Sequence, residues 1–336
     1  MKLLLVMILA TAVSAVAERP KRPVPAYSKS KAASVKPHAA GINPTVVNDP
    51  GAPLPTANGS SALRAQILLD RAGFSSGEID GTLGTNTSRA LKAFQQSHSL
   101  PATGRMDRAA WTALNTDASP ALVPYTIGAE DVKGPFVEIP ADMMEKSKLE
   151  HLGYTSALEG LAEKFHCSPQ VLKALNPQAT FETAGEELLV PGIRDQRTAR
   201  AAKVVVSKSE STVSAFDARG KLIAQYPASI GSQHDPLPVG QWKITGVARQ
   251  PVFHYNPDLF WDASTEHSKA LIPAGPNNPV GVVWIDLSKP HYGIHGTPEP
   301  GHVGHTQSHG CIRLTNWDAL ELAGMVTKGI PAILKE

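Results

Sequence analysis

Hydrophobic positions in residues 61–114 recur at the three- and four-residue spacing that is typical of helices. Three groups of residues follow this spacing: Leu63, Ile67 and Leu68; Ala90, Leu91 and Phe94; Trp111 and Leu114. Glycines punctuate the connection between the first two groups, and Asp107 is a natural N-terminal cap for the third. The pattern predicts three short helices, which we assign to a first module over residues 60–116.

A weaker helical pattern occupies residues 122–193, which we call the second module. One helix face is marked by Leu158, Leu161, Ala162 and Phe165. The pair Ser168-Pro169 is typical of a second helix start, because proline is tolerated in the first turn. Residues 188–191 then have the pattern of a short strand.

After residue 194 the pattern changes to short β-branched or aromatic segments separated by Gly, Pro and Asp. They predict strands over residues 203–206, 211–216, 221–226, 241–247, 282–286 and 292–295. One good helix follows. We expect it to begin near Asn316, whose side chain can cap it, and to carry Trp317, Leu320 and Ala323 inward. This third module, residues 202–335, is therefore expected to be a mostly antiparallel β-sandwich or barrel within a multidomain α+β chain.

Residues 252–278 contain four aromatic side chains, Phe253, Tyr255, Phe260 and Trp261. These can either wall a substrate channel or fill a core. We favour the core.

The first 17 residues have the pattern of a secretory signal, with Lys2, an apolar run over residues 3–13 and a small-x-small site at Ala15-Val16-Ala17. Residues 18–59 are rich in Pro, Ala, Ser and Lys and predict a disordered linker, a plain tether more than an anchor to an anionic surface. No later stretch approaches the roughly 18 apolar residues that span a bilayer. We expect the protein to leave the cytoplasm, without stable membrane insertion after the signal is removed.

The formal net charge is +2 over 336 residues, which argues against nucleic acid as a partner. The two cysteines, Cys167 and Cys311, are expected to be free thiols, since a chain of this length can bury cores without a disulfide. Cys167 ends an apolar helical stretch and is expected to be a packed thiol. Only Cys311 has chemically suitable neighbours in the sequence.

Those neighbours form the run Ser308-His309-Gly310-Cys311-Ile312-Arg313, preceded by His295-Gly296-Thr297. A thiol attacks a carbonyl as thiolate, so it needs a group that lowers its pKa or accepts its proton, and His295 is the nearest plausible upstream base. Gly310 permits a sharp turn that can direct the amides of Gly310 and Cys311 at a developing oxyanion. The arrangement fits acyl transfer.

Two other interpretations of the same residues remain open. Cys311 can be a small buried hydrophobe among satisfied histidines, or it can belong to a zinc site, since five of the chain's twelve histidines lie between residues 291 and 309. Glycines interrupt this segment and no HExxH or paired CxxC motif is present. We therefore expect no metal and no cofactor.

The first two modules resemble known wall-binding families. The first is similar to the peptidoglycan-binding domain type 1 in Ala72-Gly73-Phe74, Ile79-Asp80-Gly81, residues 90–95, Leu100-Pro101, Thr103-Gly104 and Trp111. The second, with Tyr125-Thr126-Ile127, Asn176 and Pro177, looks like a LysM domain, a glycan-binding βααβ unit, interrupted by an insertion at residues 129–153. Because of that insertion, glycan binding and a structural spacer are both retained for the second module.

The third module is similar to the L,D-transpeptidase family, also called the YkuD domain. The resemblance rests on Ile294-His295-Gly296-Thr297, Ser308 to Leu314, Gly231, Pro238 and Gly240, Gly275-Pro276-Asn277-Asn278-Pro279 and Asn316-Trp317-Asp318-Ala319. It implies that Cys311 is the nucleophile and His295 its base, with the backbone around Gly296 orienting the imidazole. It also places His309 beside the nucleophile, where it shapes the oxyanion turn or contacts substrate.

The roles of two further motif residues stay open. Arg313 either binds a peptide carboxylate or braces the fold, and we favour the brace slightly. Ser308 is expected to hydrogen-bond within the turn.

The resemblance implies an enzyme that is secreted across the inner membrane to the periplasm or cell wall. Its implied partners are peptidoglycan stem peptides and glycan. Such an enzyme forms 3→3 cross-links through a cysteine thioester, releases D-alanine from a donor tetrapeptide, and is sensitive to carbapenems. Water as acceptor would instead give a carboxypeptidase or endopeptidase, and a lysine of an outer-membrane protein would tether that protein to the wall. A non-catalytic wall-binding protein is the rival from another class.

Overall fold

The computed structural model describes residues 41–194, 199–308 and 310–336, all within one compact unit from Pro37 to Glu336. The predicted signal peptide, residues 18–40 of the predicted linker, and His309 lie outside the described residues. In the part of the chain that the structure describes, no helix is long and apolar enough to cross a membrane.

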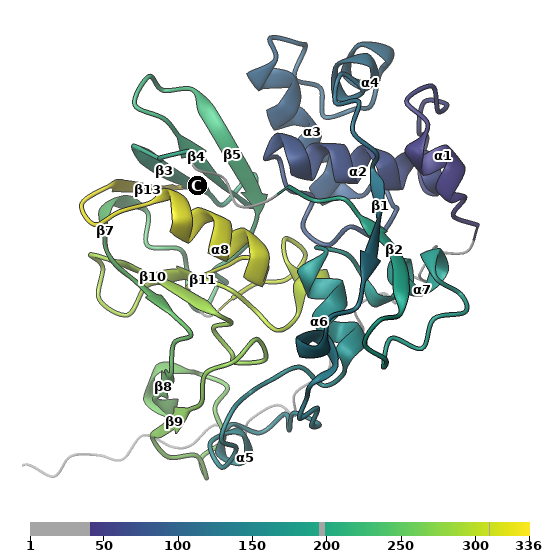
Figure 1. Cartoon of the computed structure of the whole chain (residues 1–336). Coiled ribbons are helices and arrows are strands. Elements are labelled where there is room, and N and C mark those ends of the chain that lie inside the picture. Colours follow the sequence, from purple (N-terminus) through teal and green to yellow (C-terminus); the bar gives the residue numbers. More distant parts are fainter. Residues whose placement is uncertain (1–40, 195–198, 309) are drawn as a thin grey trace, which may run out of the picture. The chain divides into compact units, whose positions relative to one another are not determined.

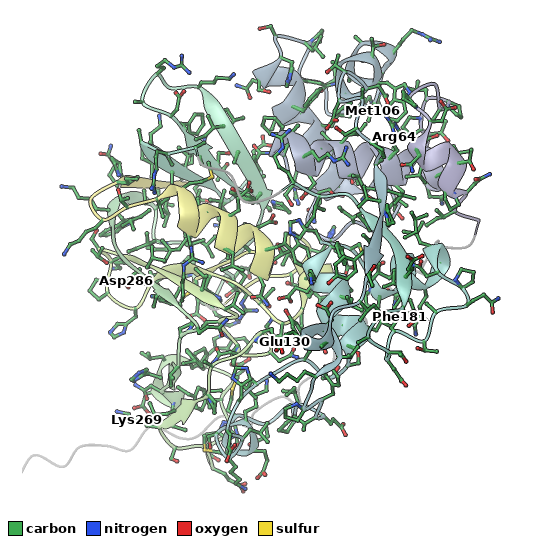
Figure 2. The ribbon with its side chains drawn as sticks, viewed as in Figure 1. Arg64, Met106, Glu130, Phe181, Lys269 and Asp286 are labelled. Carbon is green, nitrogen blue, oxygen red and sulfur yellow. The ribbon has the colours of Figure 1, made fainter. Side chains whose placement is uncertain are left out.

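The last part of the predicted linker, residues 41–59, is ordered, so the expectation of disorder is wrong there. Helix α1, Pro44–Asn48, has Asn43 as its cap, and its Val47 is fully buried. The carbonyl of Val47 accepts a hydrogen bond of 2.9 Å from Nη1 of Arg64, a buried side chain of the next helix (Figure 2). The composition of this segment did not indicate order, because its structure depends on contacts with residues outside it, such as Arg64.

The first module contains the three expected helices, α2 (Ser60–Ala72), α3 (Thr85–Ser97) and α4 (Arg108–Leu114). Asp107 caps α4 by accepting from the backbone N–H of Ala110, as predicted. The predicted apolar face of α2 is shared between two cores, however. Leu68 packs within the first module, whereas Leu63 and Ile67 pack into the core of the second.

The second module has the βααβ order expected from the sequence. Strand β1 (Leu122–Thr126) pairs antiparallel with β2 (Glu187–Pro191), and helices α6 (Ala157–Lys164) and α7 (Pro169–Leu175) lie between them in the chain. Ser168 caps α7 and Pro169 occupies its first turn. The insertion at residues 129–153 contains a 3-10 turn, η1 (Ala129–Val132), and one helical turn, α5 (Met143–Lys146).

The third module is built on a nine-stranded sheet in the order β5-β4-β3-β13-β7-β10-β11-β12-β6. Its strands are β3 Lys203–Ser207, β4 Thr212–Phe216, β5 Leu222–Pro227, β6 Ser229–Ile230, β7 Gly240–Arg249, β10 Val283–Leu287, β11 Gly293–His295, β12 Ile312–Arg313 and β13 Pro331–Lys335. All neighbours are antiparallel except β3 with β13 and β11 with β12. The two end strands, β5 and β6, are separated in the chain only by Ala228, so the sheet curls into a barrel-like form, as predicted.

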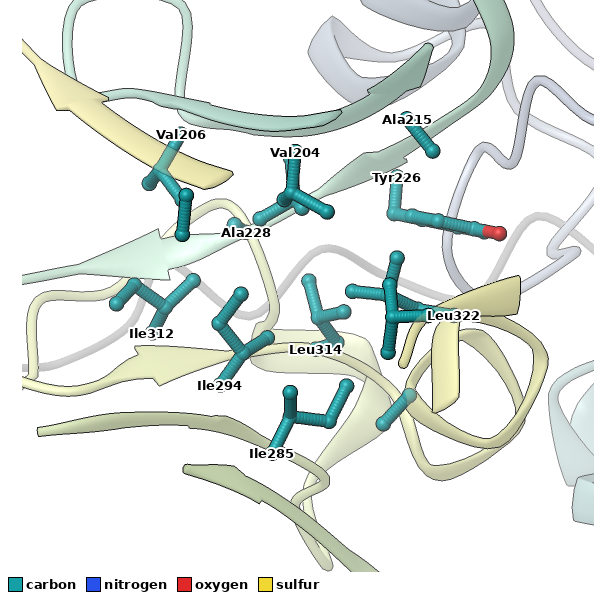
Figure 3. Packing of buried hydrophobic residues seen from close by; sticks show 14 of the residues in the cluster. Val204, Val206, Ala215, Tyr226, Ala228, Ile285, Ile294, Ile312, Leu314 and Leu322 are labelled. Atoms are coloured by element: carbon teal, nitrogen blue, oxygen red, sulfur yellow. The ribbon is translucent and has the colours of Figure 1, made fainter. Parts of the chain in front are cut away.

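The interior of this sheet is the main hydrophobic core (Figure 3). Val204 and Tyr226 from one half of the sheet pack in the same cluster as Ile285 and Ile294 from the other half. Helix α8 (Asn316–Met325) lies beside β10 and β11 and adds Leu322 to this cluster (Figure 1).

The cap of α8 is Thr315 and not Asn316. The Thr315 hydroxyl accepts from the backbone N–H of Asp318. Asn316 has other partners: its Oδ1 accepts from the N–H of Val282, and its Nδ2 donates to the carboxylate of Glu163 in the second module. A cap prediction from sequence could not include these distant partners.

Residues 250–279, which we call the lid segment, leave the sheet between β7 and β10. They carry a separate pair of strands, β8 (Phe253–Tyr255) and β9 (Ala270–Ile272), and a 3-10 turn, η2 (Pro257–Leu259). Tyr255 is buried in a small cluster with Leu152 and Ile272, as the core prediction required. Trp261 is 61% exposed, so for that residue the core prediction is wrong.

Candidate active site

The strands β11 and β12 bring the motif residues together. They pair in parallel with Ile294 opposite Ile312 and His295 opposite Arg313. Side chains alternate between the faces of a strand, and both isoleucines point into the core. His295, Cys311 and Arg313 therefore lie on the other face, where all three line one cavity of about 960 Å³.

His295 is held by two contacts. Its ring stacks on the indole of Trp284, its partner across the β10–β11 pair, with 5.3 Å between ring centres and 15° between planes. Its Nδ1 lies 2.7 Å from the carbonyl oxygen of Gly296. Because a carbonyl only accepts, Nδ1 carries the proton and Nε2 is left with a free lone pair. The predicted orientation of the imidazole by the Gly296 backbone is present.

The charge state of His295 follows from its surroundings. The side chain is only 3% exposed. Burial, reinforced by the positive charge of Arg313, lowers the pKa of His295 to about 3. The imidazole is therefore neutral in the free protein at pH 7 and can accept a proton.

Gly296 leaves room for this arrangement. A Cβ at that position would lie 2.1 Å from Oδ1 of Asn316, the atom that also accepts from Val282. The position of the Asn316 side chain therefore requires glycine at residue 296. The sequence motif alone did not reveal this packing constraint.

Cys311 is a free and partly accessible thiol just before β12. Its Sγ lies 3.7 Å from the carbonyl oxygen of His291. Burial raises the pKa of the Cys311 thiol, and the backbone N–H of Gly293 and the charge of Arg313 oppose the rise only in part. Burial thus opposes the first route to a thiolate, a lowered pKa. For the second route, the neutral imidazole of His295 lines the same cavity and is the candidate proton acceptor.

The turn before Cys311 is shaped by glycine and serine. Gly310 has φ +93°, a conformation that side chains disfavour, and a Cβ there would lie 2.9 Å from the Tyr292 ring. The buried Ser308 hydroxyl donates to the carbonyl of Cys311, which is the hydrogen bond within the turn that we expected.

Arg313 is half-buried and faces the cavity. Burial lowers the pKa of its guanidinium, against the charges of Cys311, Glu299 and Asp262. Within residues 41–194, 199–308 and 310–336 no hydrogen bond or salt bridge of this guanidinium is found, in contrast to what a structural brace requires. The geometry favours the carboxylate-binding role that we had placed second.

The other cavity walls include residues that sequence reasoning missed. Phe253, Tyr255 and Phe260 of the lid segment line the cavity, so they are channel wall as well as core. Met143 lines it too, although it belongs to the second module. The only sequence signal for Trp284 was its place in a predicted strand two strands from Cys311, and Met143 offered none.

The histidine-rich segment does not form a metal cluster in the part of the chain that the structure describes, where no group of three or more His, Cys, Asp or Glu side chains could hold an ion. The backbone carbonyl of His291 is a contact of Cys311. The ring of His302 lies 3.3 Å from the carboxylate of Glu299.

Comparisons with known proteins identify two of the three modules. The family model for the L,D-transpeptidase catalytic domain matches residues 201–334, and the model for a putative peptidoglycan-binding domain matches residues 58–114. A putative L,D-transpeptidase YkuD of Bacillus licheniformis is 34% identical over 174 residues, which span 51% of this chain and 89% of the relative. The chain belongs to the L,D-transpeptidase family.

Further relatives of the L,D-transpeptidase family were found in sequence and in structure. The putative L,D-transpeptidase YkuD of Bacillus subtilis is 31% identical over the same share of both chains. A crystal structure of an L,D-transpeptidase from Xylanimonas cellulosilytica aligns with 84% of this chain and 96% of its own, at 15% identity and a TM-score of 0.36. The family and the peptidoglycan-binding module together make peptidoglycan the partner of this protein.

Proposed function

We propose that this chain is a secreted L,D-transpeptidase that forms 3→3 peptidoglycan cross-links through a thioester on Cys311. The observation that carries the proposal is the shared cavity wall: Cys311 and the neutral, oriented His295 project from adjacent strands into one cavity. An acyl transfer needs a nucleophile and a base in one place, and this pair supplies both.

In the first half-reaction the Cys311 sulfur attacks the carbonyl carbon of the third residue of a donor tetrapeptide. The thiol proton passes to the free Nε2 of His295, so the thiolate forms as attack begins and is not present beforehand. The bond from that carbonyl carbon to the nitrogen of D-alanine breaks, and the amine leaves with the proton from His295. The product is a thioester on Cys311.

In the second half-reaction a side-chain amine of an acceptor stem peptide attacks the thioester carbonyl. His295 accepts a proton from that amine, the carbon–sulfur bond breaks, and the proton returns to the sulfur. The new amide is the cross-link, and the enzyme regains its starting state.

Other motif residues support the charges that develop. We assign the amides of Gly310 and Cys311 to the oxyanion. From its place in the sequence motif, we assign His309 to the oxyanion turn or to substrate contact. We assign Arg313 to a carboxylate of the stem peptide, because its guanidinium faces the cavity without a hydrogen bond or salt bridge to any described residue.

The other modules fit an enzyme held on the wall. The peptidoglycan-binding module is an anchor by this proposal, the βααβ segment contributes glycan contacts, and residues 1–17 direct export.

Mass spectrometry of tetrapeptide muropeptides incubated with the mature protein tests the proposal. We expect 3→3 dimers and free D-alanine with the wild type and neither with Cys311→Ala. Tripeptides without dimers would identify water as the acceptor and a carboxypeptidase. Identical products from both proteins would overturn the catalytic role of Cys311 and favour a wall-binding protein.

A further inference from the structure

A chain of hydrogen bonds joins the second module to the wall of the catalytic cavity. Oδ2 of Asp142, at the start of α5, lies 2.9 Å from Nε2 of His267 in the lid segment. The other ring nitrogen of His267, Nδ1, lies 2.8 Å from the hydroxyl of Tyr255. Tyr255 and His267 both line the cavity that holds Cys311.

The insertion and the lid segment also interlock through their backbones. The N–H of Leu152 donates to the carbonyl of Ala274, and the N–H of Asn277 donates to the carbonyl of Leu152. A Cβ at Gly275 would lie 2.1 Å from the Leu152 carbonyl oxygen, so the approach is close enough to require glycine. The lid segment is therefore fixed on a part of the second module, and Met143 of that part reaches the cavity.

The donors and acceptors in this chain of hydrogen bonds follow from the carboxylate of Asp142 at one end. A carboxylate only accepts, so Nε2 of His267 carries the proton and donates to Asp142. The hydrogen bond from His267 is the main cause that lowers the pKa of Asp142, which keeps the carboxylate charged. In the neutral ring, Nδ1 of His267 then accepts from the Tyr255 hydroxyl, so the lone pairs of the phenolic oxygen remain available to a hydrogen-bond donor.

We propose that the insertion at residues 129–153 contributes to substrate binding in the catalytic cavity. Asp142 and His267 are positioning residues that set the Tyr255 hydroxyl as an acceptor for an N–H group of the bound stem peptide. The second module thereby governs substrate binding by the third, whether or not it also binds glycan. This inference rests on the proposed function for its substrate but not for its hydrogen-bond geometry.

Three variants test the chain. Tyr255→Phe removes the acceptor. Asp142→Asn keeps an oxygen that can cap α5, as Oδ1 does for the N–H groups of Met144 and Glu145, but it presents an NH₂ group to His267. His267 must then adopt the tautomer with the proton on Nδ1, which donates to the Tyr255 hydroxyl. Lys269→Ala is the matched control, since Lys269 lies in the same lid segment (Figure 2). Among the described residues its side chain has one ionic partner, Asp258, in an exposed pair at 3.8 Å.

The first readout is the His267 tautomer, measured by ¹⁵N chemical shifts of the ring nitrogens in the full chain. We expect Nε2–H in the wild type and in Lys269→Ala, and Nδ1–H in Asp142→Asn. An Nδ1–H wild type, or a tautomer unchanged by Asp142→Asn, would overturn the inference. This measurement does not depend on the proposed reaction.

The second readout is kinetic. Tyr255→Phe and Asp142→Asn are each expected to raise KM for the donor tetrapeptide about two- to tenfold, as the loss of one hydrogen bond predicts, with little change in kcat. The alkylation rate of Cys311 by a small reagent and the KM of Lys269→Ala should stay at wild-type values. A fall in kcat with unchanged KM would contradict the binding role. If the wild type forms no Cys311-dependent product, the proposed function fails while the tautomer result still stands.

Discussion

The strand pair β11–β12 and the lid segment are two walls of the same cavity, but they are ordered by different means. The strand pair is local: alternation sends Ile294 and Ile312 into the core and leaves His295, Cys311 and Arg313 facing the cavity. The lid segment depends on residues more than a hundred positions away, such as Asp142 and Leu152. By our proposals, the contrast separates residues that carry the chemistry from residues that position the substrate.

The largest expected effect is on the strand pair. His295→Asn removes the free Nε2, so we expect kcat for transpeptidation to fall by about 10²- to 10⁴-fold, the usual contribution of a general base. Rates of D-alanine release measure this loss, with thermal unfolding as a check that the variant is folded. Activity within about tenfold of wild type would show that another group accepts the proton.

Close packing between Gly296 and Asn316 should make the stability of the fold sensitive to substitution at Gly296. Gly296→Ala places a methyl group 2.1 Å from Asn316 Oδ1, and we expect it to lower the free energy of unfolding by about 1–3 kcal/mol. Chemical denaturation measures the change. Gly246→Ala is the matched control, because a Cβ at Gly246 would have no atom within 4 Å among the described residues other than its neighbours in the chain. Equal stabilities of the two variants would refute the packing argument.

Removing hydrogen bonds between the lid segment and the second module should affect substrate binding more than the chemical step. Nδ2 of Asn277 donates to the carbonyl of Gly153 and to Glu159, each at 2.9 Å. Asn277→Ala is expected to cost about 1–3 kcal/mol of stability for partners left unpaired, and to raise KM more than it lowers kcat. Steady-state kinetics beside denaturation separate the two effects. A loss confined to kcat would mean that the lid acts in the chemical step.

The smallest expected effect is on the pH dependence of Cys311. Because burial raises the pKa of this thiol, less thiolate is present near pH 7 than in a free cysteine, and alkylation should reach half its maximum rate above about pH 8.5. Since the pKa of His295 is about 3, activity should show no acid limb centred near pH 6.5. A midpoint of alkylation below pH 8.5 would indicate a preformed thiolate.

The strand pair was largely predictable from sequence, and the lid was not. Periodicity and turn residues indicate β3 to β5, β7, β10, β11 and α8, and the motif names Cys311 and His295, because these features depend on neighbours along the chain. Trp284 stacks on His295 only once the register of β10 and β11 is known.

Tertiary partners explain the errors. Asn316 looked like the cap of α8 but is engaged by Val282 and Glu163, so the adjacent Thr315 takes that position. Leu63 and Leu68 belong to the same predicted helix, but Leu63 packs into the core of the second module and Leu68 into that of the first, since α2 contacts both. No local pattern in the sequence contains such information.

Intact-protein mass spectrometry of the enzyme with a donor tetrapeptide tests the central claim most directly. The account predicts a transient adduct equal in mass to the tetrapeptide minus D-alanine, located on the peptide that contains Cys311 and released by an amine acceptor. An adduct on any other residue, or D-alanine release from Cys311→Ala at the wild-type rate, would contradict it.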